Sequence, residues 1–267
     1  MISQKKETQT QETTAEKRWD ERAHSFYLSQ KKRDESLPSE ISKYFMTAYT
    51  GIESILDVGG GAGRYAIPFA SWAKRVHMTD ISQNMLNYAL ENAEQAGLSN
   101  VTFSKLDWDE AEQMSLEMKA DLVFASMCPA VNSEAGIQKM MHFSDGYCAI
   151  NRFIVFEDSL TEAVRRGLGI EKNSIKDPHN DRKMVKYTFN LLWDKGYTPE
   201  IKLFSEDVLV ELSLEEAKDI YVTSREIEEG QFTACEAIIE AYSEDGICKI
   251  RKRHETALII WRANKTK

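Results

Sequence analysis

Short apolar runs alternate with amphipathic segments through the first 158 residues, and this alternation predicts a layered α/β fold. Apolar residues recur at helical spacing between the runs, as in helices that bury one face. Repeated strand–helix–strand order places successive strands parallel in a sheet that is covered on both faces. The expected strands cover 55–58, 75–80, 101–106, 121–126 and 148–157, and polar Asn151 and Arg152 interrupt the last of them.

The two ends of the chain differ from this central pattern. Residues 1–16 are polar and repetitive, which predicts a disordered tail. We expect one domain over 17–267, made of an N-terminal helical cap, a core and a C-terminal half (17–50, 51–158 and 159–267). In the C-terminal half, helices are expected near 160–170, 182–195, 213–217 and 232–242 and a strand over 200–212. Residues 247–262 are expected to form an edge hairpin arm or a long strand, and residues 172–182 either a mobile flap or an ordered loop.

A cluster of glycines follows the first expected strand. Gly59, Gly60, Gly61 and Gly63 come directly after its apolar run, and a helical pattern begins at Tyr65. Without Cβ atoms, glycines adopt positive φ and let a ligand lie against the main chain. The N–H groups at the start of a helix also present partial positive charge to a ligand. The stretch therefore predicts a turn that binds a nucleotide or nucleoside.

Acidic residues follow the next two expected strands. Asp80 ends the second strand, about 20 residues after the glycine turn, where a carboxylate meets ribose hydroxyls in nucleotide-binding units. Ser82 is expected to cap the next helix, which leaves Asp80 for a ligand. Asp107 and Trp108 follow the third strand, and this pair suits a purine base. The carboxylate can accept a hydrogen bond from the exocyclic amine, and the indole can pack on the purine ring.

Composition narrows the class of protein. The chain has a net charge of −9 and no basic patch that stands out, which makes a nucleic acid an unfavourable partner. No apolar stretch reaches membrane-spanning length. We expect a soluble cytoplasmic protein without a metal site or disulfide framework, because the four cysteines are scattered and form no Cys-x-x-Cys pair (Cys128, Cys148, Cys235 and Cys248).

The motif Asp57-x-Gly59-x-Gly61-x-Gly63, with Asp80 and Asp107-Trp108, resembles that of class I S-adenosylmethionine-dependent methyltransferases. The resemblance covers about residues 19–158 well and the C-terminal part in outline, where it points to a bacterial small-molecule-type subgroup. It implies a Rossmann-like sheet of seven mostly parallel strands, an antiparallel last strand, extra N-terminal helices and a C-terminal helical insertion. It also implies that S-adenosyl-L-methionine is the cofactor and that its methionine end, ribose and adenine lie against Asp57, Gly59, Gly60, Gly61, Gly63, Asp80, Ile81, Asp107, Trp108 and Ser126.

The methyl acceptor is expected to be a small molecule. The segment 126–129 lacks the Asn-Pro-Pro-Tyr type of sequence found in methyltransferases that act on nucleic-acid amino groups. Methyl transfer from a sulfonium needs the acceptor, methyl carbon and sulfur in line more than it needs a general base. No residue stands out by its type as such a base. Tyr27, His142 and Cys128 are the catalytic candidates, each with an ordinary structural role as the competing interpretation. His254, in a basic run, is expected to be structural.

Three alternatives stay open at this point. An NAD-dependent oxidoreductase would have the fingerprint Gly-x-Gly-x-x-Gly, with a small residue at the third glycine position. If the fingerprint starts at Gly59, that position holds Arg64, and if it starts at Gly61, the position fits only through Ala66. A methyltransferase acting on protein or RNA would share the same cofactor residues. So would a non-catalytic protein that binds S-adenosylmethionine. The sequence leaves the acceptor, the methylated atom and the oligomeric state undetermined.

Overall fold

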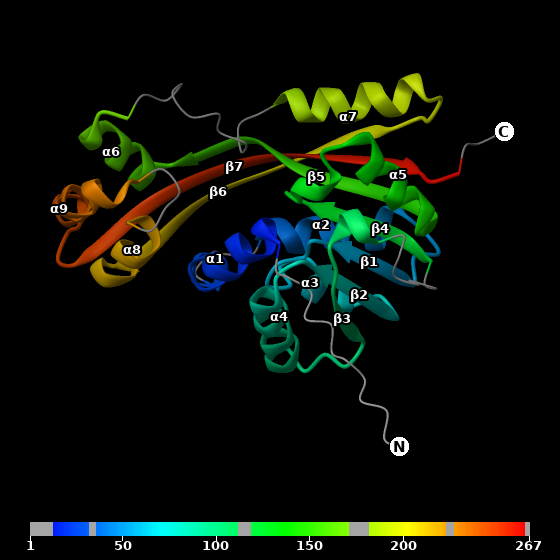
Figure 1. The fold of residues 1–267 in the computed structure, drawn as a ribbon, viewed down its shortest axis with the longest axis horizontal. Helices are drawn as coiled ribbons and strands as arrows, with labels where there is room; N and C mark the ends of the chain where they lie inside the picture. Colours follow the sequence, from blue (N-terminus) through cyan, green and yellow to red (C-terminus); the bar gives the residue numbers. More distant parts are fainter. Residues whose placement is uncertain (1–12, 32–35, 112–118, 171–181, 223–226, 265–267) are drawn as a thin grey trace, which may run out of the picture.

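A seven-stranded sheet forms the centre of the molecule (Figure 1). The computed structural model describes residues 13–31, 36–111, 119–170, 182–222 and 227–264. The strand order is β3-β2-β1-β4-β5-β7-β6, in which β1 to β5 pair in parallel and β7 is antiparallel to both β5 and β6. The fold class expected from the sequence is confirmed. The strands are β1 (Ser54–Val58), β2 (Arg75–Asp80), β3 (Val101–Lys105), β4 (Ala120–Ser126), β5 (Ser144–Asp158), β6 (Glu200–Ser213) and β7 (Ile247–Arg262).

Helices cover both faces of the parallel part of the sheet. Leu56 and Val58 point to a core shared with α5 and α7, whereas Ile55 points to a core shared with α2, α3 and α4. This alternation within one strand is the two-residue period of β structure. The helices are α1 (Thr14–Lys31), α2 (Ser36–Ala48), α3 (Ala66–Ala70), α4 (Gln83–Gln95), α5 (Glu134–His142), α6 (Ser159–Leu168), α7 (Arg182–Asp194), α8 (Leu214–Tyr221) and α9 (Phe232–Tyr242).

The last three strands continue well past the others and form an arm (Figure 1). β5, β6 and β7 have 15, 14 and 16 residues, whereas β1 has 5. The outer ends of the three strands carry α6, α8 and α9 around a separate apolar cluster that includes Leu160, Leu212 and Ile239. We call this unit, residues 153–168, 205–222 and 227–254, the arm.

The continuity of β5 corrects one expectation. Asn151 and Arg152 do not interrupt the strand, which runs unbroken from Ser144 to Asp158 with a register shift near Phe153. Both side chains are buried and hydrogen-bonded: Asn151 to Tyr65 and Ser126, Arg152 to the Cys128 carbonyl. Polar residues persist inside a strand when partners satisfy them.

The N-terminal helix begins earlier than expected. Thr14 to Glu16 belong to α1, so the tail expected over 1–16 is wrong at its end, and residues 1–12 lie outside the described part. The Thr13 hydroxyl accepts from the Glu16 amide, and Glu16 forms an ion pair with Lys105 of β3. These contacts give a polar segment a reason to be helical.

Several local expectations are confirmed, and one falls on residues outside the described part of the chain. Ser82 caps α4, and Ser213 forms a capping box with Glu216 at the start of α8. The helix after the glycine turn ends at Ala70, slightly before the expected end near Trp72. Nearly all of the segment 172–182 lies outside the described residues. Within the described residues, the structure has no helix long and apolar enough to cross a membrane.

Candidate active site

The glycine turn lies at the carboxyl ends of the parallel strands, where α/β sheets bind their ligands. Gly59, Gly61 and Gly63 have φ values of 65°, 59° and 86°. The amides of Gly59 and Gly60 donate to the Thr79 carbonyl of β2 at 2.8 and 3.1 Å, which ties the turn to the neighbouring strand. A side chain on the turn would have little room, because a Cβ on Gly60 would lie 2.5 Å from a Met78 atom. The absence of side chains on the turn thus lets a ligand come close to its backbone.

Replacing Gly59 by alanine is expected to destabilise the protein by about 2–4 kcal/mol, since a positive φ and a steric clash both oppose the new Cβ. That Cβ would lie 2.5 Å from the Cys128 sulfur. Urea unfolding measures the change. Gly97→Ala is the matched control, because Gly97 has φ 67° with nothing within 4 Å and should cost only the backbone strain. Equal losses in the two variants would contradict the contact with Cys128.

Two buried carboxyl groups flank the turn. Asp57 in β1 is 1% exposed and Asp80 at the end of β2 is 8% exposed. Burial and, second, the nearby charge of Asp80 raise the pKa of Asp57 to about 7, and burial also raises the pKa of Asp80. Asp80 accepts from the amides of Gly61 and Ser82, both at 2.9 Å, whereas Oδ2 of Asp57 is buried without a hydrogen-bond partner. Such a pair of acids favours a cationic ligand.

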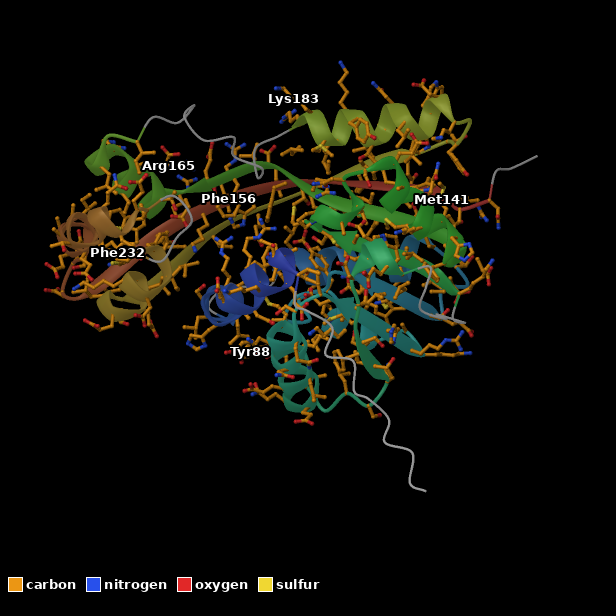
Figure 2. All side chains as sticks on the ribbon, in the orientation of Figure 1. Tyr88, Met141, Phe156, Arg165, Lys183 and Phe232 are labelled. Carbon is orange, nitrogen blue, oxygen red and sulfur yellow. The ribbon has the colours of Figure 1, made fainter. Side chains whose placement is uncertain are left out.

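Helix α1 covers the turn from the outside. Asp20 accepts from the Ser82 hydroxyl at 2.5 Å and from the Asn84 amide at 3.0 Å, which fixes α1 to the start of α4. Tyr27 stacks on Tyr88 of α4 with ring centroids 4.2 Å apart (Tyr88 is labelled in Figure 2). On the same side, Phe26 comes within 3.4 Å of the place where a Cβ on Gly61 would be. α1 also contacts α8 of the arm.

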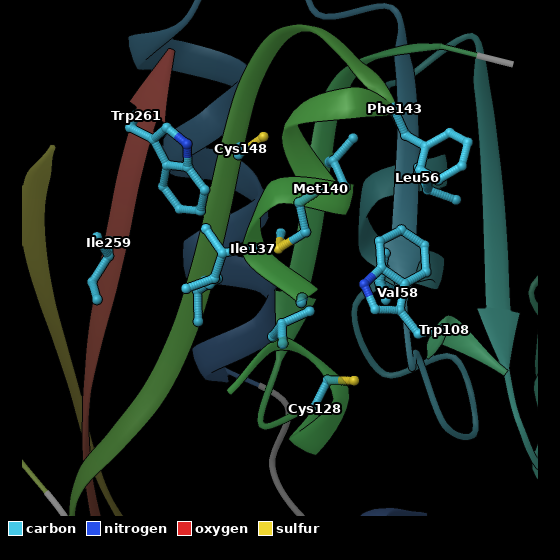
Figure 3. Close-up of a cluster of buried hydrophobic side chains, with 14 of the residues drawn as sticks. Leu56, Val58, Trp108, Cys128, Ile137, Met140, Phe143, Cys148, Ile259 and Trp261 are labelled. Carbon is cyan, nitrogen blue, oxygen red and sulfur yellow. The ribbon is translucent and has the colours of Figure 1, made fainter. Parts of the chain in front are cut away.

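The third strand brings Asp107 and Trp108 to the same edge, but the two differ in their surroundings. Asp107 is half-buried and caps a short 3-10 turn by accepting from the Asp109 amide at 3.0 Å. Trp108 is buried in the core, packs on Phe143 at 5.6 Å between centroids and donates to the Gly136 carbonyl (Figure 3). Its indole therefore has a packing role, and contact with adenine stays a prediction. Ile81, after β2, is partly exposed at this edge.

A hydrogen-bonded polar group joins the end of β4 to the middle of β5. Asn151 donates to the Tyr65 hydroxyl at 2.9 Å and to the Ser126 hydroxyl at 3.2 Å. Tyr65 is buried, and burial raises its pKa. The side-chain oxygen of Asn151 is buried without a hydrogen-bond partner. This group can orient an acceptor next to the cofactor region.

A buried Glu206–His254 pair lies on β6 and β7, and the sequence reasoning missed its Glu206 and dismissed His254. His254 is fully buried, donates from Nδ1 to Glu206 Oε1 at 2.7 Å and stacks on Phe156. Ser36 of α2 donates to the other Glu206 oxygen at 3.0 Å. Burial works to raise the pKa of Glu206, but these hydrogen bonds and the charges of His254 and Arg64 hold it below its usual value. The sequence signal for an inward Glu206 is that it shares the two-residue period of the apolar residues Phe204, Val208 and Val210.

The three catalytic candidates take different places. Tyr27 lies against α4 as described, near the turn. Cys128 is buried in the core cluster of Figure 3, and burial raises the pKa of its thiol to about 11, so it remains a thiol at neutral pH. His142 is at the opposite edge of the sheet, because α5 ends there directly before β5 begins; its neighbour Met141 is at the right of Figure 2. The sheet thus separates His142 from the glycine turn.

Comparison with known proteins agrees with this architecture. Residues 52–189 match the methyltransferase domain family. A protein of Bacillus halodurans C-125 assigned as a methyltransferase superposes with a TM-score of 0.51 at 19% identity, covering 86% of this chain and 98% of that one. A protein of Anaeromyxobacter dehalogenans assigned as a type II methyltransferase gives 0.52 at 12% identity, covering 86% and 97%.

A short sequence match falls on RNA-modifying enzymes. The tRNA/tmRNA (uracil-C(5))-methyltransferase of Azotobacter vinelandii is 34% identical over 67 residues, and that of Campylobacter curvus is 34% identical over 65. The match spans 25% of this chain and only 19% of the Azotobacter protein.

The chain belongs to the methyltransferase domain family. Its fold is Rossmann-like. The donor set of the site fits S-adenosylmethionine, the cofactor that the sequence motif implies, because the ammonium and sulfonium groups of that molecule are cations and two buried carboxyl groups flank the turn. When bound, the cofactor supplies a methyl group already activated on sulfur.

Proposed function

We propose that the protein transfers the methyl group of S-adenosylmethionine to a small-molecule acceptor by in-line displacement. One observation carries this proposal: α1 covers the glycine turn, because its Phe26 lies against Gly61 while the helix contacts α4 and α8 of the arm. A long RNA or protein segment needs an open path to the methyl group, whereas a small molecule fits beneath a covering helix and leaves water outside. The net charge of −9 further disfavours RNA.

We also propose roles for the residues at the strand ends. Oδ2 of Asp57, which lacks a partner, would accept from the ammonium group of the cofactor. Asp80 would accept from the ribose hydroxyls, Asp107 from the adenine amine, and Ile81 would pack on the adenine face. The glycine amides and the Ser126 hydroxyl would complete the contacts, and this chain's residues would hold the acceptor in line with the methyl carbon.

Incubation with methyl-labelled S-adenosylmethionine and separate fractions of a cell extract tests the acceptor class. We expect label in the small-molecule fraction and none above background in tRNA, rRNA or protein. Gly59→Ala, assayed at a temperature where it is folded, should transfer much less, because its turn is distorted. Label in an RNA or protein fraction alone would contradict the proposal. Cofactor binding without transfer to any fraction would indicate a non-catalytic binding protein.

A further inference from the structure

Arg64, the residue after the glycine turn, has two buried donor atoms that no protein group pairs with. Its Nε and Nη2 atoms are both buried and both lack a hydrogen-bond partner in the structure. These two nitrogens form one side of the guanidinium plane, and their N–H bonds run parallel. That fork matches the two oxygens of a carboxylate. Burying two donors without partners is unfavourable, so a ligand that pairs both of them is favoured.

The acid on which the charge of Arg64 acts is already hydrogen-bonded to other groups. Glu206 feels the charge of Arg64, yet its two oxygens accept from His254 and Ser36 and none of them bonds to Arg64. The guanidinium carbon lies 5.9 Å from the centre of the Tyr65 ring. Arg64 therefore keeps its positive charge available inside the molecule, because neither neighbouring side chain neutralises its free edge.

The position of Arg64 favours the acceptor side of the site over the cofactor side. Its charge acts on Tyr65 and on Glu206 of β6, and Tyr65 in turn bonds to Asn151 of β5. These residues join the core to the base of the arm. Arg64 is not among the groups whose charge shifts the pKa of Asp57 or Asp80, the two acids proposed to hold the cofactor, although the charge of Asp57 does act on Tyr65.

We infer that the methyl acceptor carries a carboxylate that stays anionic during the reaction, and that the Nε–Nη2 edge of Arg64 binds it. Arg64 is then a specificity-determining residue, and the substrate class is small carboxylic acids. The inference rests on the proposed small-molecule function. The cofactor also has a carboxylate, on its methionine end, and the experiment separates these two sources.

The first experiment determines the charge of the product. The methyl-labelled small molecule made from a cell extract should be retained on an anion exchanger at pH 7 and released at pH 2, where carboxylates are protonated. A labelled product that gains no mass on esterification in acidic methanol has no free carboxylate; that result overturns the inference and leaves the small-molecule function standing. Label in RNA or protein alone overturns both.

The second experiment changes the Nε–Nη2 edge of Arg64. Arg64→Gln removes the charge and Arg64→Lys keeps it without the bidentate edge, so both should lower transfer to that product by about 30-fold or more. Arg75→Gln is the matched control, since Arg75 is exposed at the start of β2 on the opposite edge of the sheet. Calorimetric titration with S-adenosylmethionine should give unchanged affinity in all three variants, which also reports that they are folded.

The same titration identifies the cofactor's carboxylate if it is the true partner. In that case Arg64→Lys and Arg64→Gln would weaken the binding of S-adenosylmethionine but not that of 5′-methylthioadenosine, which lacks the amino acid end. That result overturns the inference, as does normal transfer by both Arg64 variants.

Discussion

Asp57→Asn is expected to bind S-adenosylmethionine at least about 100-fold more weakly and yet to be more stable than the wild-type protein at pH 8. The buried carboxylate is proposed to pair with the ammonium group of the cofactor, and losing such a charged partner costs about 2–5 kcal/mol. Without the cofactor, the same carboxylate lies beside Asp80 with one unpaired oxygen and is a burden to the folded state. An amide removes that burden together with the binding.

The pH dependence follows from the raised pKa. The folded state keeps the Asp57 proton to about pH 7, whereas the unfolded state loses it near 3.8. Between these values the folded state binds more protons, so wild-type stability falls as pH rises, by up to about 1.4 kcal/mol per pH unit from this group. The stability advantage of Asp57→Asn should therefore grow from pH 5 to pH 7 and then level off. Urea unfolding at several pH values measures it.

Asp121→Asn gives a matched control of opposite sign. Burial works to raise the pKa of Asp121, but hydrogen bonds from Ser54 and Glu53 outweigh it and lower the pKa. This variant should lose stability at neutral pH, and its deficit should stay constant from pH 5 to pH 8. A stability difference for Asp57→Asn that is the same at pH 5 and pH 8 would contradict the raised pKa.

Lys252→Met is expected to destabilise the protein by about 3–5 kcal/mol, because it leaves a buried carboxylate without its counter-charge. Lys252 and Asp158 are 3.3 Å apart, with side chains 5% and 4% exposed. Asp158 also accepts from Tyr221 at 2.7 Å and caps α6 through the Thr161 amide. The ion pair thus joins β7, β5, α6 and α8 within the arm.

Urea unfolding of Lys249→Met provides the comparison for this variant. Lys249 lies on the same strand but is exposed, so its replacement should change the unfolding free energy by less than about 0.5 kcal/mol. If Lys252→Met lost as little as Lys249→Met, the buried pair would have no part in holding the arm together.

The sequence by itself determined the elements whose signals are local. The glycine turn follows from its composition, and Ser82 and Ser213 follow from capping chemistry. The helix over 232–242 and the strand over 247–262 have the bounds that their periodic patterns predict. Each of these depends on neighbours within a few residues, which the sequence displays directly.

The tertiary structure decided the features whose partners are distant in sequence. Ser36 meets Glu206 across 170 residues, Glu206 meets His254 across 48, and Tyr65 meets Asn151 across 86. Asn151 and Arg152 suggested a break in the strand because their partners were not visible. The sequence predicted the strands over 200–212 and 247–262 and the helices of the C-terminal half, but not that they form one arm. Which polar residues are buried, and which Arg64 nitrogens lack a partner, depends on three-dimensional packing that no local pattern encodes.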